Sequence, residues 1–170
     1  MSCRREAADA GLHYLDLRPR TEKELRDYLK RKEYDEKEID DAIEYLKEYG
    51  YVDDRKYCME YFRFAQKKGR SDYRIIRELE QKGVSPEISR AELELIRESS
   101  DFDGRDLILD DRTKALDVAM KMVRAEKDKE RIRDPKFQAR VARRLSGLGY
   151  DSSTVYHVLS KIKNEEFIDG

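Results

Sequence analysis

Apolar residues recur at helical spacing along most of this chain, and charged residues fill the positions between them. Residues 35–50 show the pattern, because four apolar side chains share one helix face: Ile39, Ala42, Ile43 and Leu46. No stretch alternates apolar and polar residues for long enough to predict a strand. The pattern therefore predicts an all-α protein.

Capping residues and helix breakers divide this pattern into nine predicted helices. Thr21 and Glu24 form a capping box, in which each side chain accepts a hydrogen bond from a free backbone N–H at a helix start. Ser85 and Pro86 begin the sixth helix, since proline at the first helical position lacks an N–H that would have no helical partner. The buried stripe predicted for that helix is Ile88, Ala91 and Leu95. The other predicted caps are Asp35, Asp53 or Asp54, Ser71, Asp134 and Asp151.

The turn between the second and third helix of each set occurs three times, at residues 29–35, 79–85 and 145–151. Each copy has a core leucine, a short turn, an apolar residue and a capping side chain. Three-helix units of this size bury little alone, so repeated units stack on their neighbours. We therefore expect three tandem three-helix repeats forming an elongated, curved helical array. The predicted repeats are 1–50, 51–97 and 112–170, joined by an acidic linker at 98–111 with a weak apolar dock at 107–109.

Charge is balanced over the whole chain but not along it. The 37 basic and 38 acidic residues give a net charge of −1. Residues 85–111 carry nine acids against three arginines, whereas residues 124–144 carry nine basic residues against four acids. Such segregation favours one face for an anionic partner, although solvated helix faces explain any single charged stretch equally well.

The sequence contains none of the motifs that catalysis or cofactor binding requires: no phosphate-binding glycine loop, no HExxH, no GxSxG and no EF-hand pattern. His13 and His157 are interpreted as structural or exposed, and Cys58 as a small core residue. We therefore expect a protein that is not an enzyme and uses no metal or cofactor. The cysteine spacing and the lack of an apolar signal or membrane-length segment favour the cytoplasm.

Two basic stretches are candidates for binding a partner. One runs from the end of the fourth helix through the fifth, and the other occupies the equivalent helix of the third repeat. Long basic side chains there could meet DNA phosphates or the acidic surface of a protein. One tyrosine beside the first stretch is a candidate for base stacking. The candidates are Lys67, Lys68, Arg70, Tyr73, Arg74, Arg77, Lys82, Arg140, Arg143 and Arg144.

The middle of the chain resembles the central signature of the RecX family. The matching segments are Gly50–Tyr57, Lys68-Gly69 and Arg74–Val84. The resemblance implies a non-catalytic cytoplasmic regulator of three three-helix repeats, which binds in the groove of the filament that the RecA recombinase forms on DNA and limits strand exchange and filament growth. It carries over Arg74, Arg77 and Lys82 as surface candidates. Residues 71–73 depart from the signature, where more basic or proline-like residues are expected.

A second class of function stays open from the sequence. A three-helix unit can resemble a helix-turn-helix, so the chain could be a stand-alone nucleic-acid-binding protein. That alternative predicts tight, strongly salt-dependent binding to bare DNA, which the near-zero net charge disfavours. The leading hypothesis is a monomer that binds the recombinase filament, and possibly the DNA within it, and that has no contact with a membrane.

Overall fold

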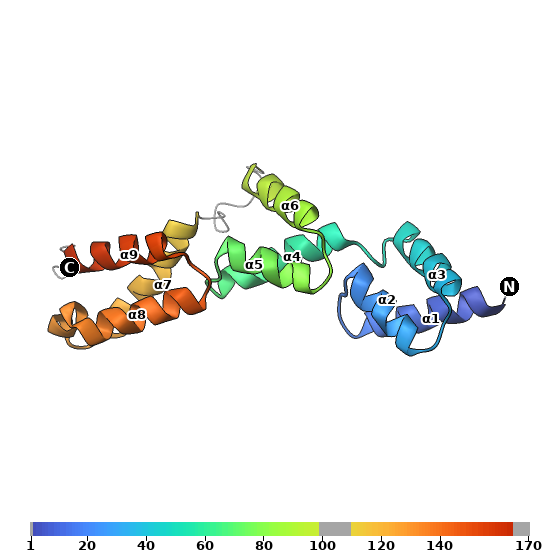
Figure 1. Ribbon diagram of the computed structural model, residues 1–170, viewed down its shortest axis with the longest axis horizontal. Helices are drawn as coiled ribbons and strands as arrows, with labels where there is room; N and C mark the ends of the chain where they lie inside the picture. The colour runs from blue at the N-terminus through green and yellow to red at the C-terminus, as the bar shows by residue number, and fades with distance from the viewer. Residues whose placement is uncertain (1, 99–109, 165–170) are drawn as a thin grey trace. The chain divides into compact units, whose positions relative to one another are not determined.

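The computed structural model describes residues 2–98 and 110–164, and every regular element in those ranges is a helix (Figure 1). The predicted all-α class is therefore confirmed. The helices are α1 Ser2–Asp16, α2 Glu22–Arg31, α3 Glu36–Glu48, α4 Asp54–Lys67, α5 Asp72–Gln81, α6 Pro86–Glu98, α7 Asp111–Ala125, α8 Pro135–Gly147 and α9 Ser152–Asn164, with a 3₁₀ turn, η1, at Lys129–Arg133. Most of the predicted acidic linker, including its apolar dock at 107–109, lies outside the described residues.

The predicted caps form as expected at most helix starts. Thr21 and Glu24 make a full capping box at α2, and Asp35 makes a second one with Glu38 at α3. Asp151 accepts the backbone N–H of Thr154 at 2.7 Å at the start of α9. Side-chain capping of this kind satisfies N–H groups that have no partner inside the helix. Local chemistry therefore fixes where these helices begin.

Described by their internal contacts, the helices fall into two compact units. The first comprises Met1–Phe62 with Ile76–Glu98, and the second comprises Arg63–Ile75 with Ser99–Gly170. In the first, α1, α2 and α3 pack around a core that includes Leu25, Leu29 and Ile39. In the second, α7, α8 and α9 pack around a core whose members include Phe137, Val141, Leu145 and Val158.

The buried face of α6 differs from the predicted stripe. Ala91 is exposed and Leu95 is 52% exposed, so the prediction for these two residues is wrong. The face that packs inward carries Ser89, Glu92, Leu93 and Ile96. The Ser89 hydroxyl lies 3.9 Å from the Cys58 thiol, and Glu92 reaches Arg55 at 3.5 Å. Because Ser89 and Glu92 are polar, the spacing of apolar residues did not predict that this face packs inward.

Inside the first unit, the N-terminus of α2 forms hydrogen bonds with the turn between α5 and α6 and with the start of α4. The Thr21 hydroxyl donates to the Lys82 carbonyl at 2.6 Å, and the Glu22 N–H donates to the Asp54 carboxylate at 2.9 Å. Asp54 is the first residue of α4. The start of α2 is therefore held between the start of α4 and the end of α5.

The N-terminus of α5 makes an equivalent set of hydrogen bonds inside the second unit. We call each of these two sets, at the start of α2 and at the start of α5, a joint. The Ser71 N–H donates to the Leu148 carbonyl at 3.0 Å, and the Asp72 N–H donates to the Asp111 carboxylate at 3.1 Å. Asp111 begins α7 just as Asp54 begins α4, and Leu148 follows α8 as Lys82 follows α5. Because the first turn of α5 packs in this second joint, residues 63–75 group with α7–α9.

Glycine is required where these joints form. Gly83 and Gly149 adopt φ values of +91° and +93°, which L side chains disfavour. A Cβ added to Gly149 would lie 2.7 Å from the Ser71 Oγ and 2.6 Å from the Arg74 Cβ. Glu33 occupies the same turn position after α2 with φ +65°, but it is exposed and lies in neither joint. A side chain is therefore tolerated only at the turn that packs against no other helix start.

We expect Gly149→Ala to lower the free energy of unfolding more than Gly50→Ala. Gly50 has φ +71° with no other atom within 4 Å of an added Cβ, so alanine there costs only the backbone strain, about 1 kcal/mol. At Gly149 the clash in the joint adds a further ~1–3 kcal/mol. Urea unfolding followed by circular dichroism measures both values, and equal losses would contradict the role assigned to the joint.

Candidate partner-binding surface

The first basic stretch forms the end of α4 and the start of α5, and we call residues 63–75 the basic segment. Lys67 ends α4, and Gly69 then takes φ +73°. A Cβ at Gly69 would lie 2.6 Å from the Val118 side chain, so only glycine allows this close approach to α7. The segment carries five cationic residues: Arg63, Lys67, Lys68, Arg70 and Arg74.

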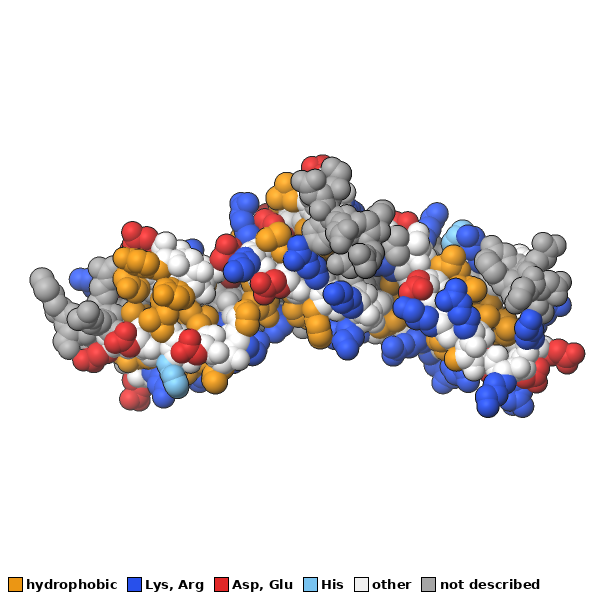
Figure 2. All heavy atoms as spheres, turned by 180° about the vertical axis from the view of Figure 1, so that it is seen from behind, with side chains coloured by type: hydrophobic (Ala, Val, Ile, Leu, Met, Phe, Trp, Pro, Cys, Tyr) orange, Lys and Arg blue, Asp and Glu red, His pale blue; other side chains and the backbone are white. Residues whose placement is uncertain are grey.

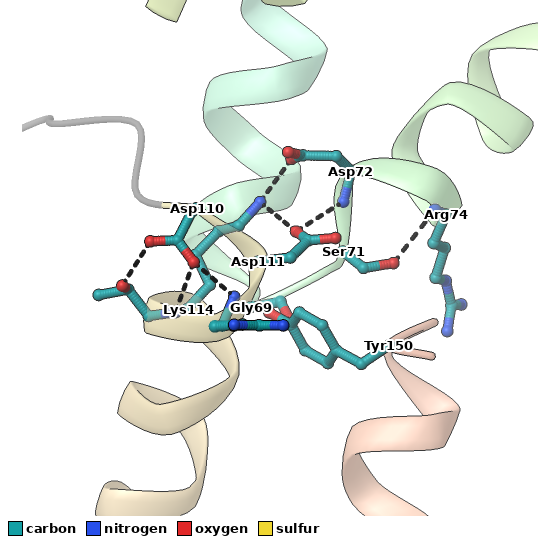
Figure 3. Close-up of polar contacts among 10 residues, drawn as sticks. Gly69, Ser71, Asp72, Arg74, Asp110, Asp111, Lys114 and Tyr150 are labelled. Carbon is teal, nitrogen blue, oxygen red and sulfur yellow. Dashed lines mark hydrogen bonds and ion pairs between the residues drawn. The ribbon is translucent and has the colours of Figure 1, made fainter. Parts of the chain in front are cut away.

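The turn within the basic segment is tied to α7 and to the turn between α8 and α9 (Figure 3). The Tyr150 hydroxyl donates to the Gly69 carbonyl at 2.8 Å, and the Arg74 N–H donates to the Ser71 hydroxyl at 3.2 Å. The Arg74 guanidinium donates to the Gly147 carbonyl at the end of α8. The peptide groups of the turn are therefore held before any partner binds.

A buried ion cluster lies beneath this turn. The Lys114 ammonium pairs with the Asp72 carboxylate and lies 2.7 Å from the Asp111 carboxylate, and the Lys114 side chain is only 7% exposed (Figure 3). Buried charges are tolerated when they are paired and hydrogen-bonded. Residues 71 and 72, where the sequence departs from the family signature, therefore have structural roles. The Ser71 hydroxyl caps the start of α5, and the Asp72 carboxylate neutralises the buried Lys114 ammonium.

Burial also determines the protonation state of Tyr150. Burial raises the pKa of its phenol well above the usual range, and the negative charges of Asp111, Asp72 and Asp117 raise it further. The hydroxyl consequently keeps its proton and acts as a donor to the Gly69 carbonyl at any physiological pH. This hydrogen bond therefore does not depend on pH in that range.

The second basic stretch lies along the outer face of α8. The Arg140 guanidinium pairs with Glu126 at 2.9 Å and lies 4.9 Å from the Phe137 ring. Arg143 and Arg144 are exposed, and both lie within one turn of Gly147, the residue that Arg74 contacts. Figure 2 shows Lys and Arg side chains, in blue, gathered over the part of the molecule formed by α7–α9.

The structure thus brings Arg74 to the C-terminal end of the arginine face of α8. Both belong to the second compact unit. This arginine surface consists of Arg74, Arg140, Arg143 and Arg144. Its cations can bind phosphate oxygens or carboxylates through charge-assisted hydrogen bonds.

Two of the predicted candidates belong to the first unit instead. Arg77 is exposed on α5. Lys82 is partly buried: its ammonium lies 3.8 Å from Glu24 and 5.9 Å from the Tyr61 ring, and its carbonyl accepts the Thr21 hydroxyl. These contacts give Lys82 a structural role in the α2 joint, and its contact with a partner stays a prediction.

Sequence reasoning missed one residue of the basic segment. Phe64 is 52% exposed, and the Lys68 ammonium lies 5.7 Å from the centre of its ring. Tyr73, the candidate for base stacking, is 68% exposed. The i, i+4 spacing of Phe64 and Lys68 was the signal for this pair, and Phe64 lies off the apolar stripe that includes Phe62.

The part of the chain that the structure describes offers no group of three side chains arranged to hold a metal ion. Burial raises the pKa of the Cys58 thiol to about 11, so the thiol stays protonated and is a poor nucleophile. Among the described helices, none is long and apolar enough to cross a membrane.

Comparisons with known proteins identify relatives along nearly the whole chain. A family profile described as "RecX, first three-helix domain" matches residues 7–46. A regulatory protein RecX of Clostridium beijerinckii is 31% identical over 91% of this chain and 67% of the relative, and one of Clostridium perfringens is 30% identical over 95% and 70%. The crystal structure of RecX from Lactobacillus salivarius has a TM-score of 0.70, covering 95% of this chain and 97% of that one at 21% identity, which supports the shared fold.

We expect Lys114→Met to destabilise the protein by about 3 kcal/mol, because it leaves the Asp72 carboxylate buried without its cation. The double variant Asp72→Asn with Lys114→Met removes both charges and should recover much of that loss. Thermal or urea unfolding of the wild type, the two single variants and the double variant measures the coupling energy. Additive losses would show that the two charges do not interact.

Proposed function

Because this chain belongs to the RecX family, we propose that it is a non-catalytic regulator of the RecA recombinase. It binds the RecA–DNA filament and modulates recombinase activity, in the inhibitory direction, during DNA repair and recombination. The named relatives are regulatory proteins, and they match this chain along nearly its whole length. In this proposal the protein acts in the cytoplasm as a monomer, without a cofactor.

The observation that carries the proposal is the arginine surface on a fixed frame. Arg74 is anchored by hydrogen bonds at both its backbone and its guanidinium, and the arginines of α8 stand on a helix whose other face is core. A frame that is ordered before binding loses less conformational entropy when the complex forms. Cations held in this way suit a filament that presents carboxylates and DNA phosphates.

A stand-alone nucleic-acid-binding protein remains the second candidate. The arginine surface would serve bare DNA as well as a filament, since phosphates attract guanidinium groups in either setting. The net charge of −1 favours the filament, because acids elsewhere on the chain reduce its non-specific attraction to free DNA. The two candidates differ in whether the recombinase is required.

Single-stranded-DNA-dependent ATP hydrolysis by RecA of the same species tests the proposal. Titration with this protein should reduce hydrolysis at well below one molecule per recombinase subunit. Arg140→Ala with Arg143→Ala should raise the concentration required by about tenfold or more, since a hydrogen bond to a charged group contributes roughly 1.5–3 kcal/mol. No effect of the wild-type protein at equimolar ratio, with folding verified by circular dichroism, would refute the proposal.

The matched control is Arg90→Ala, which removes an exposed arginine from α6, outside the arginine surface. This variant should inhibit hydrolysis as the wild type does. An equal loss in the control and in the α8 variants would show that total charge, rather than the arginine surface, governs the effect.

A further inference from the structure

Helix α6 carries an apolar stripe, Ile88, Ala91 and Leu95, whose spacing of three and four residues places it on one face of the helix. Ala91 is exposed, Leu95 is 52% exposed and Ile88 is partly buried. The core of the first unit uses another face of α6, on which Leu93 and Ile96 are each 6% exposed. We call the exposed face the α6 stripe. It is a second apolar face that the core of the first unit does not explain.

Three glutamates form a row along one edge of the α6 stripe. Glu87, Glu94 and Glu98 are seven and four residues apart, so they share one side of the helix, and all three are exposed. Glu94 and Glu98 each follow a residue of the stripe by three positions, which places them directly beside it. Charged residues that border an apolar seam select the partner, because like charges repel and opposite charges attract.

The opposite edge of the α6 stripe is already neutral. The buried Glu92 side chain lies 3.5 Å from the Arg55 guanidinium, inside the first unit. Arg90 and Arg97 are each two residues from a member of the stripe, which places them on the other side of α6. The charge beside the stripe is therefore that of the glutamate row.

We propose that the α6 stripe is a docking surface for a basic amphipathic helix of a protein partner. An amphipathic helix recognises such a face through apolar anchors at i, i+3 and i+7, and the stripe offers the same spacing. Lysines or arginines along the flank of the partner helix pair with Glu87, Glu94 and Glu98. This inference goes beyond the proposed function, because the surface belongs to the first unit and selects a charge opposite to that selected by the arginine surface.

The glutamate row disfavours two other ways of covering the stripe. A second copy of this chain, packed stripe against stripe, would bring the carboxylates of both rows to one seam, where they repel each other. An anionic lipid surface would be repelled by the same three carboxylates. A partner that combines apolar anchors with cations meets neither cost.

Fluorescence anisotropy with a labelled peptide of leucine and lysine tests the inference. The peptide has about 14 residues, or four helical turns, with leucine at the i, i+3 and i+7 spacing. We expect the full chain to bind it at least about tenfold more tightly than the same peptide with glutamate in place of lysine. The affinity should fall as salt is added, since exposed charges are screened.

Two variants separate the apolar contribution from the charged one. Ala91→Gln with Leu95→Gln keeps the charge and should weaken binding by about tenfold or more, because the leucine side chain no longer leaves water on binding. Glu94→Gln with Glu98→Gln keeps the stripe and should weaken binding by about threefold to tenfold and reduce its dependence on salt. All four positions are exposed, so the variants should fold, which circular dichroism verifies.

Each variant has a matched control outside α6. Leu17→Gln changes a leucine that is 73% exposed directly after α1, and Glu44→Gln with Glu48→Gln removes two exposed carboxylates from α3. Both controls should bind the leucine–lysine peptide as the wild type does. Equal losses in a variant and its control would overturn the inference, and so would equal affinity for the lysine and glutamate peptides.

Two further measurements decide between occupants. A dimer seen by sedimentation velocity that Leu95→Gln dissociates would overturn the inference in favour of a second copy. Binding to vesicles of phosphatidylcholine and phosphatidylglycerol that Leu95→Gln abolishes would overturn it in favour of a lipid surface. None of these experiments contains the recombinase, so their failure would leave the proposed function as it stands.

Discussion

The first peptide N–H groups of α2 and α5 have no partner inside their own helices, and the fold depends on how they are satisfied. An α-helix always leaves such groups at its start, and burying them unpaired is costly. In each case the carboxylate of an aspartate on another helix accepts one of these N–H groups. Asp54, the first residue of α4, accepts from α2, and Asp111, the first residue of α7, accepts from α5. The residue before each helix also donates a hydrogen bond to a carbonyl in a later turn: Thr21 donates to Lys82, and Ser71 donates to Leu148. Both joints therefore form because the first N–H groups of a helix need acceptors outside that helix.

The second joint explains why the basic segment has its sequence. Asp72 is required beneath the turn because Lys114 is buried there, and Tyr150 is required because the Gly69 carbonyl turns inward. These residues are structural, whereas Lys67, Lys68 and Tyr73 of the same segment are exposed.

Much of the fold follows from the sequence, because helix starts are encoded locally. Thr21, Asp35 and Asp151 each identify a helix start through a side chain that reaches a nearby backbone N–H. The inner face of α6 could not be predicted, since Ser89 and Glu92 are polar and become buried only through Cys58 and Arg55 on another helix. The 3₁₀ turn η1 was also missed, because its five residues give no helical periodicity.

The candidate partner-binding surface was predicted only in its composition. Arg74 and the arginines of α8 were identified as basic positions, but their proximity depends on a contact between residues 73 positions apart. Spacing within one helix does not show which residues of a distant helix it contacts.

The turns after α2, α5 and α8 differ in whether they can carry a side chain. Glycine stands at this turn where the start of another helix packs against it, at 83 and 149, and glutamate stands where none does, at 33. The group α1–α3 could not replace α4–α6, because the Glu33 side chain would occupy the space that the Lys23 side chain needs beside Gly83. Position 83 therefore admits no side chain unless Lys23 moves, whereas position 33 already carries one.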